Sequence, residues 1–143
     1  MYIDSFILTK DPPKPDVDLR DVALGETSDG IFIADHFPAD VHFGVYAELA
    51  FDPEESGTYV GHLLITPADG SPGVLKVPDS DFEVRMPSAR GEWHTRRLHA
   101  ETFDIEFTIP TESQLLLWLV VGEEAARSKG LVFTRGSHIP PLG

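Results

Sequence analysis

Alternation of apolar and other side chains between Val41 and Phe51 is the feature that most constrains the fold of this chain. Every second residue of this segment is apolar: Val41, Phe43, Val45, Ala47, Leu49 and Phe51. Because successive side chains of a β-strand point to opposite faces, a period of two predicts a long strand with one buried face. The same pattern recurs between His99 and Ile109, where acidic and hydroxyl side chains predict a solvent-exposed second face.

Short apolar segments separated by turn residues repeat along the whole chain. Turn clusters such as Asp52–Gly57 and Pro67–Gly73 divide these segments. The segments that predict strands are residues 2–8, 31–33, 41–51, 59–66, 74–77, 82–86, 99–109, 115–121 and 131–134. The pattern predicts an all-β fold: an antiparallel β-sandwich, immunoglobulin-like or jelly-roll-like, with about seven to nine short strands and little or no helix.

Three further expectations concern the arrangement of these segments. Residues 41–51 and 59–66 flank one turn, so we expect them to pair as a hairpin. The window Glu123–Lys129 is the only one that permits a helix, and it is too short to form one alone. We expect a single β-sandwich domain over residues 1–135, followed by a proline-containing tail over 136–143 that cannot extend a strand.

The charge balance of the chain restricts its partners. There are 24 acidic and 11 basic residues, which give a net charge of −13 at pH 7. Phosphate backbones and anionic lipids repel such a chain, so we expect neither a nucleic-acid nor a membrane partner. There is no cysteine, and no apolar run approaches the roughly 20 residues of a spanning helix. These features favour a cytoplasmic location.

Several turn and strand-entry motifs are similar to those of one known family. They are Asp29-Gly30-Ile31-Phe32, His36-Phe37-Pro38, the stretch Leu49–Gly57 and the stretch Val120–Glu124. With its N-terminal strand, the chain resembles a bacterial family of small β-sandwich proteins, common in actinobacteria, that is classified as a domain of unknown function. The resemblance covers most of residues 1–135 and implies a compact β-sandwich without catalytic residues to transfer. The chain departs from the family near Trp93 and in its tail.

The segment Leu115–Val121 is apolar on both faces, which predicts a central or doubly covered strand. If Leu115, Leu117 and Leu119 face the core, the outward row is Leu116, Trp118 and Val120. Such a row is covered either by another loop of the chain or by a partner, since tryptophan is enriched at interfaces. It is our candidate interface for self-association or for a protein partner.

A second candidate is the arginine-bearing stretch that we expect to form a loop. Arg90, Trp93, Arg96 and Arg97 lie close together in an otherwise acidic chain. Guanidinium groups bind carboxylates and phosphates in a bidentate way, so this loop could take an anion or an acidic partner. The alternative is that its arginines balance neighbouring acidic residues.

Metal and cofactor sites receive little support from the sequence. None of the six histidines pairs with another at a metal-binding spacing, and His94 and His99 could meet only through folding. Acidic turns could hold calcium, at Asp52, Glu54 and Glu55 or at Asp79 and Asp81, although such residues are also common in turns. We therefore expect no bound metal and no cofactor.

The pattern favours a non-enzymatic binding or assembly module that uses a sheet face for self-association or for a protein partner. One alternative is a small-ligand or carbohydrate-binding sandwich that uses exposed aromatic side chains such as Tyr46 and Trp93. Another is an enzyme whose residues converge only in three dimensions. The sandwich fold by itself does not choose between them.

Overall fold

The computed structural model describes residues 1–10, 28–87 and 96–136, which form nine β-strands and no helix. The three-stranded sheet contains, in spatial order, β1 (Tyr2–Thr9), β3 (Ala39–Phe51) and β7 (Arg97–Ile109). The six-stranded sheet contains β2 (Ile31–Ala34), β9 (Ala125–Arg135), β8 (Ser113–Val121), β4 (Gly57–Pro67) and β5 (Leu75–Lys76) in spatial order, and β6 (Phe82–Met86) pairs with β4.

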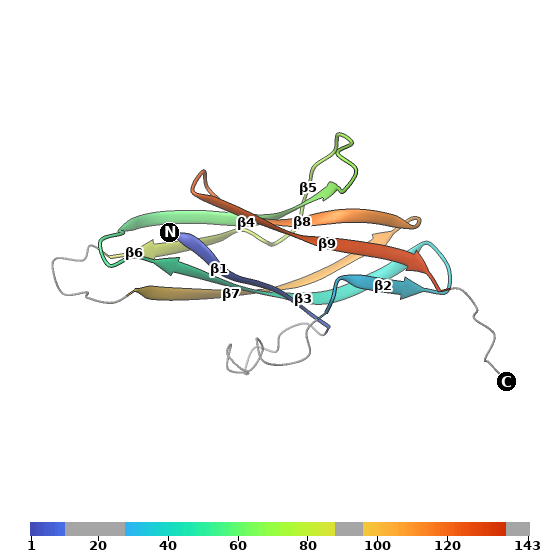
Figure 1. Ribbon diagram of the computed structural model, residues 1–143, viewed down its shortest axis with the longest axis horizontal. Coiled ribbons are helices and arrows are strands. Elements are labelled where there is room, and N and C mark those ends of the chain that lie inside the picture. The colour runs from blue at the N-terminus through green and yellow to red at the C-terminus, as the bar shows by residue number, and fades with distance from the viewer. Residues whose placement is uncertain (11–27, 88–95, 137–143) are drawn as a thin grey trace.

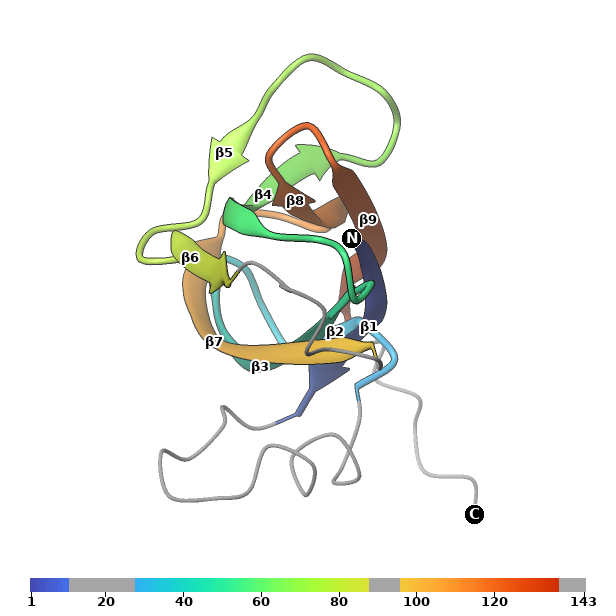
Figure 2. The same cartoon turned by 90° about the vertical axis from the view of Figure 1, so that its left-hand side faces the viewer.

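The two sheets pack face to face, so the predicted all-β sandwich is confirmed. Figure 1 shows β4, β8 and β9 in one layer and β1, β3 and β7 in the other. Viewed from the side, the strands enclose the core like a ring, with β9 beside β1 (Figure 2). Arg127 Nη1 donates to the backbone carbonyl of Asp4 at 3.5 Å, which joins the two sheets along that side.

The core lies between the sheets and follows the predicted period of two. Phe43 and Val45 of β3 belong to the same core cluster as Leu117 and Leu119 of β8, and all four side chains are fully buried. Further buried side chains come from both layers: Phe6, Leu8, Leu49, Phe51, Leu63, Ile105, Val121, Leu131 and Phe133. Burying one such side chain contributes about 1.5–3 kcal/mol, so this layer of alternate residues provides most of the stabilisation.

One glycine permits close packing inside the six-stranded sheet. Gly61 lies on the inner face of β4, where a Cβ atom would clash with the ring of Phe82 and approach the carbonyl oxygen of Val120 to 2.9 Å. The missing side chain lets Phe82 lie against β4, where its ring meets that of Phe103 at 5.7 Å. Gly61 therefore allows the short strand β6 to close one side of the core.

Strand pairing departs from the sequence-based expectations in two ways. The expected hairpin of residues 41–51 and 59–66 is wrong, because β3 pairs with β1 and β7 whereas β4 pairs with β8, β5 and β6. Both strands have a complete apolar face, and the turn between them carries the chain from one sheet to the other. All described pairs are antiparallel except β2 with β9, which is parallel.

The last strand is longer than its apolar pattern indicated. β9 begins at Ala125 and pairs with β8 from Val121↔Ala125 to Ser113↔Phe133. From Ala125 on, the helix-permitting window is therefore strand, because pairing with β8 outweighs the helix propensity of its alanine, arginine and lysine residues, whereas Glu123 and Glu124 lie in the turn before it. The tail is described only to Gly136, and residues 137–143 lie outside the described ranges.

Two adjacent leucines of β8 provide a test of the face assignment. Leu117 is fully buried, so we expect Leu117→Ala to lower the free energy of unfolding by about 2–5 kcal/mol through lost contacts and a cavity. Leu116, half-buried on the opposite face, should lose only about 1 kcal/mol in Leu116→Ala. Urea denaturation of both variants measures the difference, and equal losses would contradict the assignment.

Candidate functional site

The row Leu116, Trp118 and Val120 lies on the outer face of the six-stranded sheet, as predicted. Leu117 and Leu119 between them are fully buried, and the three outward side chains are half-buried. β8 is a central strand, because β4 and β9 pair with its two sides. The outward row therefore runs along the middle of an open sheet face.

Neighbouring strands extend this row into an apolar surface. On β4, Leu64 is directly opposite Trp118. On β9, Ser128 and Gly130 are opposite Trp118 and Leu116, and a Cβ atom added to Gly130 would meet nothing within 4 Å. Small residues on β9 thus leave one side of the Trp118 row uncovered by large side chains.

The indole of Trp118 has its polar atom satisfied within the sheet. Trp118 Nε1 donates to Thr66 Oγ1 at 3.0 Å. The indole N–H would therefore keep its acceptor when a partner covered this face. A buried indole N–H without an acceptor would cost about 1–3 kcal/mol. The apolar surface can be covered without this desolvation cost.

The same face has no acidic residue on five strands, and we call it the neutral face. Its outward residues are Ile31 and Ile33 of β2; Thr58, Val60, His62, Leu64 and Thr66 of β4; Lys76 of β5; Gln114, Leu116, Trp118 and Val120 of β8; and Ala126, Ser128, Gly130, Val132 and Thr134 of β9. The sixth strand, β6, adds Glu83 opposite Val60 at the border of this face, where Arg85 Nε lies 2.5 Å from its carboxylate. Lys76 Nζ lies 2.7 Å from Asp81 Oδ1, so its charge is balanced at the edge.

The outer face of the three-stranded sheet has the opposite character. Its outward residues on β3 and β7 include Asp40, Glu48, Asp104 and Glu106. The acidic residues of a chain with net charge −13 are therefore unevenly distributed between the two faces. The connection between β4 and β5 rises above the neutral face and borders it on one side (Figure 1).

The two arginines of the predicted anion loop that the structure describes contact the chain itself. Arg96 lies over the ring of Tyr2, 5.1 Å from its centroid, and donates to the Tyr2 hydroxyl. Its Nε is 3.8 Å from Asp52 Oδ1. Arg90 and Trp93 lie outside the described ranges.

Arg97 fastens the turn between β3 and β4. Its Nη2 donates to the carbonyl oxygens of Glu55 and Pro53 at 2.5 and 3.4 Å, and its Nη1 donates to that of Pro87 at 3.3 Å. Together with the Arg96–Asp52 pair, these contacts within the chain favour the alternative in which the arginines balance neighbouring acidic residues. An anion or partner site at this loop stays a prediction.

The carboxylate of Glu55 links this turn to the N-terminal residue. One oxygen accepts from the Met1 ammonium, and the other accepts from the Asp52 backbone N–H at 3.0 Å. These two hydrogen bonds hold the pKa of Glu55 below its ordinary value of 4.5, and the bond from the Met1 ammonium has the larger effect. In the acidic turn that we considered for calcium, both carboxylate oxygens of Glu55 thus already accept hydrogen bonds from the chain itself.

Pairs of histidine and carboxylate occur on the three-stranded sheet, but no group of three candidate metal ligands is found in the described ranges. His42 Nε2 is 2.5 Å from Asp104 Oδ1, and His99 Nε2 is 2.8 Å from Glu101 Oε1. A pair of ligands falls short of the four that a structural zinc site needs. His94 lies outside the described residues, so its expected meeting with His99 is not described.

We expected Tyr46 to be an exposed aromatic side chain that could bind a sugar, and this prediction is wrong. Its side chain is only 2% exposed, and its hydroxyl donates to Glu48 Oε1 at 2.6 Å. A sugar ring needs an accessible aromatic face. The carbohydrate-binding alternative therefore loses one of its two proposed contacts.

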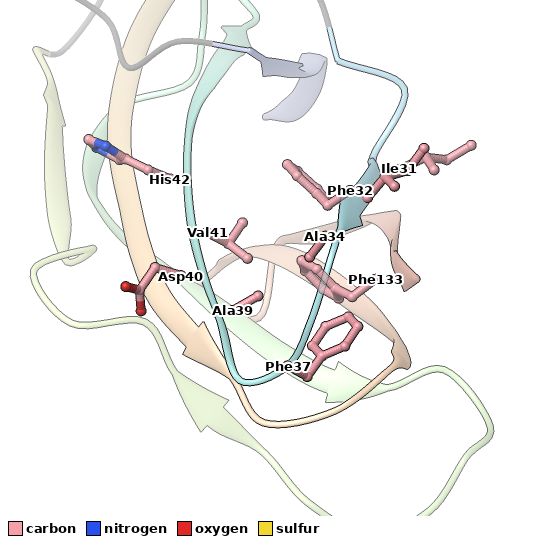
Figure 3. A pocket seen from close by; sticks show the side chains of 10 residues that line it. Ile31, Phe32, Ala34, Phe37, Ala39, Asp40, Val41, His42 and Phe133 are labelled. Atoms are coloured by element: carbon pink, nitrogen blue, oxygen red, sulfur yellow. The ribbon is translucent and has the colours of Figure 1, made fainter. Parts of the chain in front are cut away.

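A hollow that the sequence did not reveal lies between β2 and β3. It has a volume of about 310 Å³. Figure 3 shows Phe32, Phe37, Val41 and Phe133 gathered inside it, while Asp40 and His42 point away to the outer side of β3. Phe32 stacks on Phe133 with ring centroids 5.1 Å apart, so the floor of the hollow is aromatic.

Comparisons with known proteins do not assign this chain to a family. No protein-family model matches it, and no curated protein matches it in sequence. The resemblance to the actinobacterial family therefore stays a prediction.

Within the ranges that the structure describes, no helix is long and apolar enough to cross a membrane.

The contacts of Glu55 predict a pH-dependent contribution to stability. Because folding lowers the pKa of Glu55, its charged form stabilises the native state above about pH 4.5, and this contribution disappears as the pH falls through the lowered value. We expect Glu55→Gln to unfold at lower urea concentration than wild type at pH 7, with the difference shrinking below pH 4.5.

Glu54 provides the matched control for this experiment. It is exposed on the same turn, so Glu54→Gln should leave the urea midpoint nearly unchanged at pH 7. If both variants lose the same stability, net charge rather than the contacts of Glu55 explains the effect.

Proposed function

We propose that this protein is a non-enzymatic assembly module that pairs with a second copy of itself through the neutral face. The observation that carries the proposal is the absence of acidic residues from the outward positions of five strands in a chain with 24 of them. The apolar row around Trp118 lies in the middle of this face. Aromatic side chains in the centre of a patch are typical of interface hot spots.

Charge explains why a second copy is a suitable occupant. Two molecules of net charge −13 repel each other at most orientations, and the acidic outer face of the three-stranded sheet would oppose like charges directly. Contact through the neutral faces leaves the carboxylates of Asp81 and Glu83 at the border and keeps the acidic faces apart. A twofold arrangement places the same patch on both partners, as in most homodimers.

The dimensions of the sheet set the expected strength of the pairing. Five strands about 4.8 Å apart and about seven residues long, at about 3.3 Å per residue, give a face of roughly 550 Å² per protomer. The total of roughly 1,100 Å² is just below the roughly 1,200–2,000 Å² of stable specific interfaces and falls among weak, transient ones. We therefore expect a weak dimer that forms at concentrations on the order of tens of micromolar.

A serine at the centre of the face allows a specific test. Ser128 is half-buried and lies opposite Trp118, so Ser128→Glu places a carboxylate in the middle of the proposed interface without removing an apolar side chain. We expect wild type to be dimeric at tens of micromolar and Ser128→Glu to be a folded monomer, because two like charges would face each other across the interface. Sedimentation velocity measures the oligomeric state.

The control adds the same charge elsewhere. Ser56 is exposed in the turn between β3 and β4, and Ser56→Glu should stay dimeric. Circular dichroism and urea denaturation establish that Ser128→Glu is folded. A monomeric wild type at tens of micromolar, or a folded Ser128→Glu variant that stays dimeric, would contradict the proposal.

A further inference from the structure

β2 differs from every other edge strand that the structure describes, because its sequence Ile-Phe-Ile-Ala has no charged residue. Edge strands are usually protected from pairing with other chains by charges, bulges or shortness. β1 contains Asp4 and a register shift between Ile3 and Ser5. The remaining edges carry charges, as in β7 and β6, or are only two residues long, as in β5.

The outward side chains of β2 are also among the most exposed apolar groups of the molecule. Ile31 is 51% exposed and Ile33 is 70% exposed. Phe32 between them points inward, where its ring lies 5.1 Å from those of Phe43 and Phe133. The strand is therefore held by its inner face, its outer side chains are exposed, and no strand within the described ranges pairs with its second edge.

The backbone of β2 has hydrogen-bonding groups directed away from β9. The carbonyl oxygens of Gly30 and Ala34 accept from Val132 N at 2.8 Å and from Gly136 N at 2.9 Å. Because successive peptide groups of a strand alternate in direction, those of Ile31 and Ile33 point to the opposite edge. Asp29 Oδ1 caps the Ile31 N–H at 3.1 Å, so the Ile33 peptide groups are those of this edge that have no hydrogen-bond partner among the described residues.

A second unpaired edge lies across the hollow. β1 pairs with β3 only as far as Thr9↔Gly44, so residues 39–43 of β3 pair with β7 alone among the described strands. The hollow of about 310 Å³ between β2 and this part of β3 has an aromatic floor, with Phe37 at one end (Figure 3). Two free edges and an apolar floor are the elements that strand addition requires.

Charges around the hollow indicate which sequence would fit. Asp29 and Asp35 lie at the two ends of β2, and both are exposed. Among the described residues, Arg135 is the cation in register with β2, opposite Ala34, and its backbone N–H donates to Glu112 Oε1 at 2.6 Å. The rim is predominantly acidic, so basic residues at the ends of a bound segment would be complementary.

We propose that the hollow between β2 and β3 binds an extended peptide segment of a partner protein. This segment has an apolar centre and basic flanks, and it adds to β2 as a further strand. Its backbone pairs with the Ile33 peptide groups. One apolar side chain enters the hollow above Phe32, Phe37 and Phe133. Lysine or arginine residues on either side lie near Asp29 and Asp35.

The probe is a displayed library of random linear peptides, selected on wild-type protein and synthesised for calorimetry. Two variants at one position separate backbone pairing from apolar contact. Ile33→Pro removes the outward N–H without removing a bond to β9, and proline is tolerated on edge strands. Ile33→Val keeps the N–H and a β-branched side chain.

We expect enriched peptides to have an apolar centre with lysine or arginine flanks, and to slow hydrogen exchange at the Ile33 amide. Ile33→Val should bind them nearly as well as wild type. Ile33→Pro should bind them about tenfold more weakly, because one backbone hydrogen bond is lost. The same peptides with glutamate in place of their basic residues should also bind more weakly.

Three results would overturn the proposal. The first is that no peptide is enriched, or that binding is insensitive to Ile33→Pro. The second is that the Ile33 amide is already protected without peptide, which would mean that the chain itself occupies the edge. The third is that Ile33→Pro dissociates a dimer that Ser128→Glu leaves intact, which would assign this edge to a second copy. Circular dichroism confirms that Ile33→Pro is folded.

Discussion

The packing of alternate side chains between the two sheets is the interaction on which the rest of the structure depends. Phe43 and Val45 of β3 share the core with Leu117 and Leu119 of β8, and their complete burial fixes which residues of each strand face outward. A slip of one residue in either strand would expose the core side chains. The position of Trp118 on the outer face, and of Phe32 on the inner one, therefore follows from the register of the core.

Charge distribution is the second constraint, and it acts on the outer surfaces. The acidic residues of the strands lie mainly on the three-stranded sheet, whereas the neutral face has none on five strands. Net charge keeps such a chain soluble and disfavours random contacts. The same charge makes an acid-free face the surface at which self-association meets least repulsion, which is the physical basis of the proposed assembly.

The third constraint concerns the edges of the sheets, where a further strand could pair. Short length, charged residues or a register shift protect the edges at β1, β5, β6 and β7, while β2 has none of the side chains that usually prevent strand addition. Gly30 is necessary for the position of β2, because it adopts φ 81° and a Cβ atom there would clash with the carbonyl oxygen of Gly130. The close approach of β2 to β9 thus creates both the parallel pair and the cleft beside β3.

The sequence by itself determined the fold class, most strand positions and the two faces of β3, β7 and β8, because these follow from local periodicity. It did not determine which strands pair: a turn such as Asp52–Gly57 is compatible with a hairpin or with a crossing between sheets, and the apolar faces of β3 and β4 suit both. The strand character of Ala125–Gly130 was also decided by pairing with β8. The acid-free face was visible in part, since Leu116, Trp118 and Val120 alternate with core leucines, but its extent over β4 and β9 depends on strand order. The cleft at β2 was not predictable, because whether Ile31-Phe32-Ile33 is an edge is a property of the assembled sheets rather than of the segment.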